Sequence, residues 1–432
     1  MQTAEKKVIA ILGGGFAGVC AARFLGKKLK QHSLADRYRI LLVDKNDYHT
    51  YIPTLYMIAS MPKGSATTEE VSRATTVSFK EIFQGLPVEF CKCEIEKISF
   101  QRGDIHTSTG SIIQADFIIS SLGSEVNYFE IESVARYGKN LKSLSAALAI
   151  REDLSVLVAG AERKYLRMVI VGGGPTAVEL AGEMALICKK VCARKEENVC
   201  LCHVTLLTGD KPLLSQFGEK MSQRATKRLE KIGVVVQSGN RIVRATDSQL
   251  ILSSGEMIPY DFFVWAGGVF QNEILKRADL SFEENSRRIR VTDYLEAIGF
   301  GDEPNYPRVY VVGDGAGVVN KKTGALVPML ARAAISQGSV AAHNLLEEIM
   351  ADEGIIEAPK KKIFKAWDYP YVVPVGGLYG VAKFSRFVFS GTIAWAIKSL
   401  IELGYFISIL GFFRGLVKWL YSVKIFCRKR KA

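Results

Sequence analysis

The chain has 432 residues, 48% of them hydrophobic and 23% charged, a composition typical of globular proteins and long enough for two or three domains. The net charge of +13 is concentrated at one end: residues 360–432 carry 14 basic and two acidic side chains, whereas residues 1–359 carry 43 and 42. This nearly neutral body argues against a nucleic-acid-binding protein, which would present a basic face there.

No secretory signal is expected at the N-terminus. The first apolar run, Val8–Leu12, is only five residues long and ends in glycines, whereas a signal sequence has a longer apolar region. We therefore expect the body to stay in the cytosol with its eight cysteines reduced. The cysteines between Cys188 and His203 follow the spacing C-x3-C-x7-C-x-C-H, which matches no common zinc pattern, so we predict no metal site.

A first dinucleotide-binding unit is predicted near the N-terminus. The strand-like run Val8–Leu12 leads into Gly13-Gly-Gly-Phe-Ala-Gly18 and then into the helix-like segment Val19–Leu29. In the G-x-G-x-x-G pattern the first glycine allows a tight turn, the second lets a pyrophosphate approach, and the third lets the helix pack closely. A second strand, Arg39–Val43, ends at Asp44, where an acid holds ribose hydroxyls.

The same pattern recurs about 160 residues later. The strand-like Met168–Val171 leads into Gly172–Glu179 and the helix-like Leu180–Cys192. The second strand, Val204–Leu207, ends in Thr208-Gly209-Asp210, so the acid is absent or displaced by two residues. An acid there favours NAD over NADP, so this departure leaves the choice between NADH and NADPH open. Two such units suggest two dinucleotides, and a flavin with a nicotinamide is the obvious pair because hydride passes between them.

A third segment fits the flavin. Arg308–Val312 reads as a strand that ends in Gly313-Asp314, and Ala325–Asn344 reads as a long helix. An aspartate at a strand tip can bind the ribityl chain of a flavin, with the dipole of the next helix aimed at the flavin ring. A purely structural turn aspartate is an equal alternative for this segment alone.

Taken together, these motifs resemble the two-dinucleotide-fold flavoproteins, and among them most of all the type II (non-proton-pumping) NADH:quinone oxidoreductases. The resemblance covers nearly the whole chain. Asp47–Tyr56 resembles that family's second flavin segment, Asp116–Gly123 its Ala-Thr-Gly strand end, and Val264–Gly268 its Trp-Ala-Gly strand end beside the nicotinamide. Residues 21–90 lack the cysteine pair of the related disulfide reductases, which argues against that branch of the family.

The chain departs from the family beside the flavin and the quinone. There the family shows a glutamine-rich segment, and this chain has Pro328–Gly338, in which Arg332 and Ser336 replace two glutamines and only Gln337 remains. This departure leaves the geometry of quinone binding open. It does not affect the prediction of flavin binding.

The resemblance implies the following sites. FAD is expected to contact Gly13, Gly15, Phe16, Ala17, Gly18, Asp44, Lys45, Gly123, Gly313, Asp314, Leu330 and Ala331. NADH or NADPH is expected to contact Gly172, Gly174, Pro175, Thr176, Glu179, Thr208 and Gly267. Catalytic roles are implied for Glu179, Arg332 and Gln337.

Each implied role has a plainer alternative. Glu179 is expected to face the nicotinamide and to handle a proton or substrate, but a helix-N-terminal acid is also stabilised by the helix dipole. Arg332 could steady a reduced flavin or a quinone oxygen, or be a solvated helix residue. For Glu183 packing or a salt link is expected, and for His49 a structural role.

The implied fold is α/β, with two Rossmann-like dinucleotide-binding domains and a C-terminal region of amphipathic helices. The predicted segments are 1–125 and 281–350 for the FAD domain, 126–165 for a connection, 166–280 for the NAD(P)H domain and 351–432 for the C-terminal region.

The C-terminal tail has the composition of helices that lie in a membrane interface. Residues 384–413 are rich in aromatic and aliphatic side chains, with Lys398 and Glu402 as a polar stripe and Gly411 as a break. A basic face follows, with Arg428-Lys-Arg-Lys431 at the end, which suits anionic lipid. A single span with a buried Lys398–Glu402 pair, a dimer-forming helix pair and, least favoured, a nuclear-localisation tract are the alternatives.

The favoured function is therefore an FAD-dependent oxidoreductase that passes a hydride from NADH or NADPH to FAD and two electrons to a membrane quinone. We expect no proton pumping, a peripheral position on the cytoplasmic face of the membrane, contacts with anionic lipid and no binding of nucleic acid, and a homodimer is an open alternative. A reductase with a non-quinone acceptor and a non-enzymatic nucleotide-sensing flavoprotein on the membrane are the alternatives.

Overall fold

The computed structural model describes residues 5–160, 165–193, 202–209, 211–299 and 308–428. Asp210, Cys200 and the basic residues 429–431, on which predictions were made above, lie outside the described residues. The chain forms two compact units. The first combines residues 1–49, 77–125 and 270–368, and the second combines residues 50–76, 126–269 and 369–432.

A five-stranded parallel sheet forms the centre of the first unit. Its strand order is β20 (Val309–Val311), β9 (Phe117–Ser120), β1 (Lys7–Leu12), β2 (Tyr38–Asp44) and β5 (Val88–Lys92). The central strands read as continuous apolar runs because both faces of the sheet are covered.

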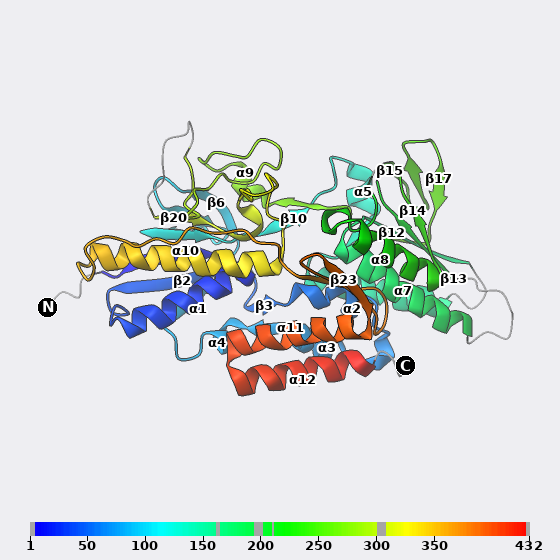
Figure 1. Cartoon of the computed structure of the whole chain (residues 1–432), viewed down its shortest axis with the longest axis horizontal. Helices are drawn as coiled ribbons and strands as arrows, with labels where there is room; N and C mark the ends of the chain where they lie inside the picture. The colour runs from blue at the N-terminus through cyan, green and yellow to red at the C-terminus, as the bar shows by residue number, and fades with distance from the viewer. Residues whose placement is uncertain (1–4, 161–164, 194–201, 210, 300–307, 429–432) are drawn as a thin grey trace. The chain divides into compact units, whose positions relative to one another are not determined.

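Helices and a small antiparallel sheet complete the first unit. Helices α1 (Phe16–Gln31) and α10 (Ala331–Asp352) lie side by side (Figure 1). Ile98 and Ile105 of the antiparallel sheet pack with Ala10 and Leu12 of β1 in one core cluster. The antiparallel strands are β6 (Ile95–Ser99), β7 (Asp104–Thr107) and β8 (Ile112–Gln114), and the short helices are α4 (Phe79–Ile82) and α9 (Glu273–Lys276).

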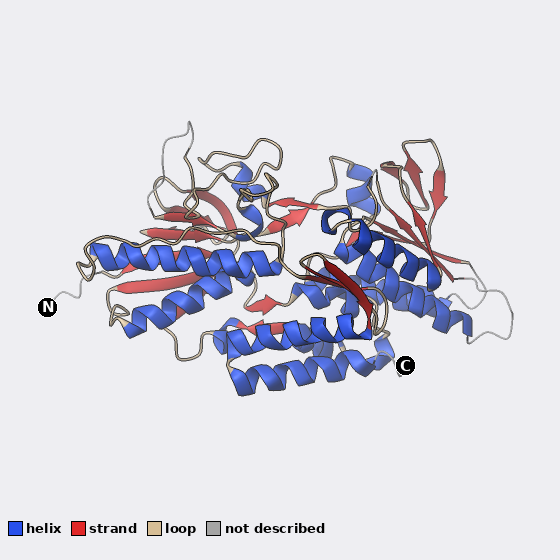
Figure 2. Ribbon diagram, in the orientation of Figure 1, coloured by secondary structure: helices blue, strands red, loops and turns tan. Residues whose placement is uncertain are grey.

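The second unit repeats the parallel architecture. Its five-stranded sheet has the order β11 (Lys139–Asn140), β18 (Phe262–Trp265), β12 (Leu166–Val171), β13 (Cys202–Leu207) and β14 (Val234–Gln237). Its helices include α5 (Glu132–Tyr137), α6 (Leu144–Gly160), α7 (Pro175–Ala193) and α8 (Glu219–Lys231), and strands β15 (Ile242–Ala245), β16 (Gln249–Leu252) and β17 (Met257–Pro259) form an antiparallel sheet (Figure 2).

The C-terminal part of the second unit is a three-stranded sheet followed by a helix pair. Helices α11 and α12 lie side by side, and the chain turns between them at Gly411, whose φ of +84° favours glycine. The predicted break is therefore confirmed. The elements are β21 (Tyr371–Pro374), β22 (Gly380–Phe384), β23 (Phe387–Gly391), α11 (Thr392–Leu410) and α12 (Phe412–Arg428), with α2 (Leu55–Ala59) and α3 (Thr68–Thr75) packed against them or their neighbours.

The two units divide the chain differently from the predicted segments. Residues 50–76 belong to the second unit, because α3 packs on α12 and α2 packs on α6 and α7. Residues 351–368 belong to the first unit, in which they continue from α10. The short strands β3 (Tyr48–Thr50), β4 (Thr76–Ser78), β10 (Ser124–Val126) and β19 (Val269–Gln271) lie where the chain passes from one unit to the other.

Two local expectations need correction. The long helix predicted from Ala325 begins six residues later, at Ala331, because the segment before it is extended. The cysteines are not all reduced: Cys188 of α7 and Cys202 of β13 form a disulfide across 14 residues of sequence. The spacing alone did not reveal that these two elements meet.

Candidate functional site

In the first glycine turn, each of the three glycine positions has its own geometric reason for lacking a side chain. Gly13 has a φ of +96°, and a Cβ atom there would lie 2.5 Å from the carbonyl oxygen of Ser121. A Cβ atom on Gly18 would lie 2.0 Å from the carbonyl oxygen of Gly13, so only glycine lets α1 start so close to the turn. At Gly15 a Cβ atom would meet nothing within 4 Å. The middle glycine therefore borders open space at the N-terminus of α1, where a phosphate binds favourably.

The residues around this turn fix its shape. Asp44, at the end of β2, accepts a hydrogen bond from the backbone N–H of Gly14 at 2.7 Å and another from the N–H of Asn46 at 2.8 Å. His49 is buried and its Nδ1 lies 2.9 Å from the carbonyl oxygen of Gly14, which fits the expected structural role. Phe16 packs edge-on against His49, with ring centroids 5.0 Å apart. Lys45 lies at the surface, 3.9 Å from the carboxylate of Glu94.

The Gly-Asp turn after β20 joins the same end of the sheet. Ser124 donates a hydrogen bond to the Asp314 carboxylate at 2.5 Å, and Gly123 has a φ of +75°. The backbone N–H of Gly313 donates to Oε1 of Gln337 at 2.6 Å, and the Gln337 side chain is only 2% exposed. The side-chain carbonyl group of Gln337 therefore holds the turn, and the catalytic role of this residue stays a prediction. Helix α10 begins further along the chain, with Leu330 as its extended N-cap residue and Ala331 as its first residue.

The second glycine turn repeats the geometry of the first. Gly172 has a φ of +138°, and a Cβ atom there would lie 2.1 Å from the carbonyl oxygen of Ala266, whereas at Gly174 it would meet nothing within 4 Å. Ala177, at the third position, is fully buried in α7, which starts with Pro175. Thr176 is exposed in the first turn of α7. Open space therefore lies above the middle glycine of both turns.

Thr208, for which a nucleotide contact is predicted, lies beside the second glycine turn. Its side chain is buried, and its hydroxyl donates to the carbonyl oxygen of Lys211 at 3.1 Å. A Cβ atom on Gly173 would lie 2.7 Å from that hydroxyl, so Thr208 packs directly against the backbone of the turn.

The strand end at Trp265 borders the same turn. Trp265 donates its indole N–H to the carbonyl oxygen of Asn127 at 2.8 Å. A Cβ atom on Gly267 would lie 2.6 Å from the Trp265 ring, so only glycine lets the backbone follow that ring closely.

A cluster of ionisable side chains surrounds Glu179 on α7. The pKa of Glu179 is raised to about 8, because burial raises it most, the cation of Lys398 on α11 lowers it, and the nearby Glu183 raises it. Burial also raises the pKa of Tyr51 and Tyr56 well above the usual range, and the negative charges of the carboxylates add to this effect. A carboxyl with such a pKa holds its proton at neutral pH, which is the state that a proton donor needs.

The cluster extends into the helix pair. Lys398 and Glu402, only 11% and 7% exposed at their side chains, lie 3.9 Å apart, and Ser422 of α12 donates a hydrogen bond to Glu402 at 3.1 Å. Burial raises the pKa of Glu402, and the cation of Lys398 opposes this effect. Lys398 also lies 5.5 Å from the centre of the Tyr56 ring. The polar stripe of α11 therefore faces the interior of the unit, and its Lys398 acts electrostatically on Glu179.

Two small cavities border this cluster within the second unit. A cavity of about 30 Å³ is lined by Lys398, Glu402 and Ser422, among others, which is enough for one or two water molecules. A second cavity of about 70 Å³ is lined by Glu183 and by largely apolar side chains that include Tyr56 and Trp395. Glu183 itself accepts a hydrogen bond from the backbone N–H of Gly377 at 3.0 Å, so it anchors the chain, in line with the expected packing role.

Comparisons with known proteins agree with this geometry. Two glycine turns of the dinucleotide-binding kind, each on its own parallel sheet, define the class of oxidoreductases with two dinucleotide-binding domains. Residues 7–338 match the pyridine nucleotide-disulphide oxidoreductase family, and the chain belongs to that family. Its relatives within the family are type II NADH:quinone oxidoreductases, which confirms the predicted family.

Two relatives align with this chain over most of their own length. The type II NADH:quinone oxidoreductase Ndh of Mycobacterium tuberculosis is 27% identical over 97% of this chain and 88% of its own length. The type II NADH:quinone oxidoreductase of Haemophilus influenzae is 28% identical over 78% of this chain and 80% of its own length.

Solved structures share the fold. NDH2 from Plasmodium falciparum, solved in complex with NADH, has a TM-score of 0.79 at 16% identity and covers 97% of this chain and 98% of its own. The sulfide:quinone oxidoreductase of Aquifex aeolicus has a TM-score of 0.74 at 16% identity, with 94% and 91% of the two chains covered.

Proposed function

We propose that this chain is an FAD-dependent oxidoreductase that passes a hydride from NADH to FAD and two electrons onward to a membrane quinone, without pumping protons. The observation that carries the proposal is the pair of glycine turns, each at the C-terminal ends of parallel strands and each with open space above its middle glycine. The names of the relatives in sequence point the same way.

The first unit offers a fitting site for FAD, which when bound accepts a hydride and releases electrons to an acceptor. The open face at Gly15 would admit the pyrophosphate, and the N-terminus of α1 would attract its charge. The Asp44 carboxylate keeps lone pairs for ribose hydroxyls beyond the two N–H groups that it already binds. Asp314 would bind the ribityl chain, and the turn that presents it is held by Gln337.

The second unit would hold NADH. The open face at Gly174 and the exposed first turn of α7, with Pro175 and Thr176, fit the pyrophosphate. Gly267 lets the backbone after the strand pass close to the Trp265 ring, which would leave room for the nicotinamide ring of NADH. We propose NADH as the coenzyme because the bacterial relatives in sequence are named for it, whereas several plant relatives are named for NAD(P)H.

Glu179 would serve the acceptor side of the reaction. Reduction of a quinone by NADH consumes one proton besides the hydride, and Glu179 is protonated at neutral pH because burial raises its pKa to about 8. Lys398 and Glu402 line the small cavity that has room for water, as does Ser422, which bonds Glu402 directly. This group would return a proton to Glu179 after each turnover.

The helix pair would attach the protein to one face of a membrane. Helix α11 is long and apolar enough to span a bilayer, but one of its sides packs on its own unit: Tyr405 and Phe406 lie 5.4 and 5.3 Å from the Tyr51 ring. Both helices of the pair also carry exposed apolar side chains that suit burial at the level of the headgroups. These side chains are Ile393 and Leu400 on α11, and Phe412, Phe413, Val417 and Leu420 on α12.

Basic side chains accompany this apolar surface. Lys424 is exposed on α12, and Arg386 is exposed just before β23. They would attract anionic lipid. Because such lipid is concentrated in the cytoplasmic leaflet, we propose that the protein lies on the cytoplasmic face of the membrane.

Steady-state kinetics with the purified full-length chain test the proposal. We expect bound FAD, oxidation of NADH faster than of NADPH, and turnover only when a quinone is added. If the flavin is reduced but no quinone is turned over, the acceptor is of another class, which the replacement of two family glutamines by Arg332 and Ser336 would then explain.

A further inference from the structure

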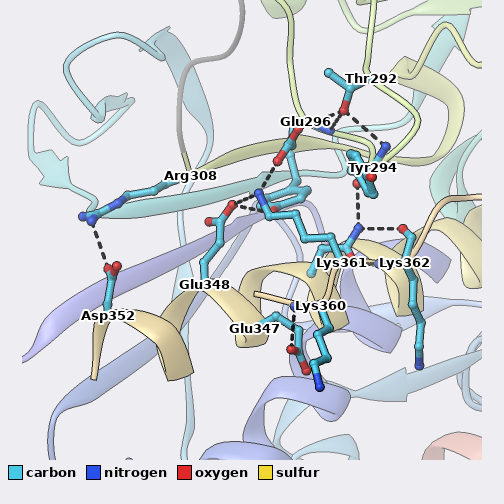
Figure 3. A network of polar contacts seen from close by, with 12 residues as sticks. Thr292, Tyr294, Glu296, Arg308, Glu347, Glu348, Asp352, Lys360, Lys361 and Lys362 are labelled. Carbon is cyan, nitrogen blue, oxygen red and sulfur yellow. Dashed lines mark hydrogen bonds and ion pairs between the residues drawn. The ribbon is translucent and has the colours of Figure 1, made fainter. Parts of the chain in front are cut away.

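Side chains along helix α10 fasten the segment that follows the helix in the first unit. The Lys361 ammonium group contacts the carboxylates of both Glu296 and Glu348 (Figure 3). A lysine between two largely buried acids tolerates little displacement, because any shift would leave a buried charge unpaired. At the start of the helix, the Arg332 guanidinium lies 5.9 Å from the centre of the Trp367 ring. These contacts hold the segment after α10 in place.

A pair of free thiols in the same unit has a different character, because it is reactive. Cys91 belongs to strand β5 and Cys93 follows directly after the strand, and their Sγ atoms lie 3.3 Å apart. Alternate residues of a strand point to the same face of the sheet, which brings these two side chains together. Two thiols alone do not complete a four-ligand metal site of the zinc kind.

The two thiols differ in their access to solvent. Cys93 is only 8% exposed and belongs to a core cluster of the unit, whereas Cys91 is half-buried. Burial raises the pKa of the Cys93 thiol to about 12, and its contact with Cys91 adds to this effect. Cys93 therefore keeps its proton at neutral pH, and Cys91 is the thiol that a solute reaches first.

We propose that Cys91 and Cys93 are an oxidation site that a peroxide converts reversibly to a disulfide. The Cys91 sulfur attacks one peroxide oxygen: an S–O bond forms, the O–O bond breaks, and the second oxygen leaves with the Cys91 proton as an alcohol or, from hydrogen peroxide, as water. The Cys93 sulfur then attacks the Cys91 sulfur: the S–S bond forms, the S–O bond breaks, and the departing hydroxide takes the Cys93 proton as water. Two electrons pass from the sulfurs to the peroxide, and a small dithiol reverses the change by thiol–disulfide exchange. The proposal does not depend on the identity of the electron acceptor.

Closure of the disulfide should move Cys93 rather than Cys91. The Cα atoms of extended residues two apart are separated by about 6.6 Å, whereas those of a disulfide usually lie about 5.5–6 Å apart. Cys91 is paired with Val43 in the parallel ladder, and Cys93 lies beyond it, with its N–H donating to the carbonyl oxygen of Asp44 at 3.0 Å. Closure should weaken this hydrogen bond, so oxidation is transmitted to the residue whose carboxylate holds the first glycine turn.

Hydrogen peroxide and peptide mapping of the full-length protein test the proposal. After treatment with peroxide and alkylation in denaturant, the peptide that contains both cysteines should have lost two hydrogen atoms and should carry no alkyl group. Dithiothreitol added before the denaturant should restore both thiols. Cys20 is the matched control, because it is also a free, half-buried thiol of the first unit, but its Sγ lies 3.0 Å from the hydroxyl of Ser339. Cys20 should be alkylated to the same extent with and without peroxide.

Variants separate the two steps. Cys93→Ser should stop the reaction after the first step, so that Cys91 gains one oxygen atom and reacts with dimedone, and Cys91→Ser should leave Cys93 reduced. Amide hydrogen exchange at position 93 should become faster when the unmodified chain is oxidised, and should not change when Cys93→Ser is treated with peroxide. The proposal is overturned if Cys91 of the unmodified chain accumulates as a sulfenic acid, if the pair stays reduced under conditions that oxidise Cys20, or if exchange at position 93 is the same in the oxidised and reduced chain.

Discussion

The pH dependence of quinone reduction should follow a single carboxyl group, that of Glu179. Burial raises its pKa to about 8 from an ordinary value near 4.5, so the protonated form persists through neutral pH and is lost above pH 8. If this form supplies a proton to the quinone, turnover at saturating NADH should fall roughly tenfold between pH 7 and pH 9.

Two variants separate Glu179 from other titrating groups. Glu179→Gln should lower the quinone-dependent rate by about 10²-fold or more, the lower end for loss of a general acid, and should abolish the alkaline decline. Lys398→Met should move the decline to higher pH, because the cation of Lys398 lowers the pKa of Glu179. Single-turnover reduction of the flavin by NADH is the internal control, and its rate should change little in either variant.

Protein stability gives an independent readout with a defined sign. The unfolded carboxyl releases its proton near pH 4.5 and the folded one near pH 8, so the free energy of unfolding should fall across this window as pH rises. Glu179→Gln should remove that decline. Persistence of both the kinetic and the stability decline in Glu179→Gln would refute this account of the carboxyl.

Three further predictions follow from the glycine turns, the disulfide and the helix pair. Gly15→Leu should purify without FAD, and Gly174→Leu should keep FAD but lose reduction by NADH, because both positions border open space and tolerate a side chain; loss of the fold, measured by circular dichroism, would contradict this. Cys188→Ser should lower the stability by up to about 3 kcal/mol, the entropic value for a loop of this length, in thermal unfolding without reductant, with no further loss when reductant is added. Phe413→Glu with Val417→Glu should weaken sedimentation with anionic liposomes at least tenfold and leave NADH-driven flavin reduction intact, since both side chains are exposed; unchanged sedimentation would show that another surface binds lipid.

The sequence predicted those features of the fold that depend on local chemistry. The apolar run before Gly13 and the glycine spacing require a strand, a tight turn and a helix within a short stretch, and both glycine turns have this form. Gly411 likewise ends α11 where the pattern changes. These features depend on residues that are close together in the sequence, so the local pattern is enough to predict them.

The parts that the sequence did not predict depend on distant contacts. No local pattern predicted that Gln337 accepts a hydrogen bond from the N–H of Gly313, 24 residues earlier in the chain. The carboxyl of Glu179 is tuned by Lys398, more than 200 residues later. No local pattern reports which helix faces meet.

The central claim, that one chain carries electrons from NADH through FAD to a quinone, is tested most directly by an anaerobic titration followed in the flavin spectrum. The account predicts that about one equivalent of NADH bleaches the bound flavin and that one equivalent of a soluble quinone restores its absorbance. A flavin that stays oxidised with excess NADH, or that stays reduced after quinone is added, would contradict it.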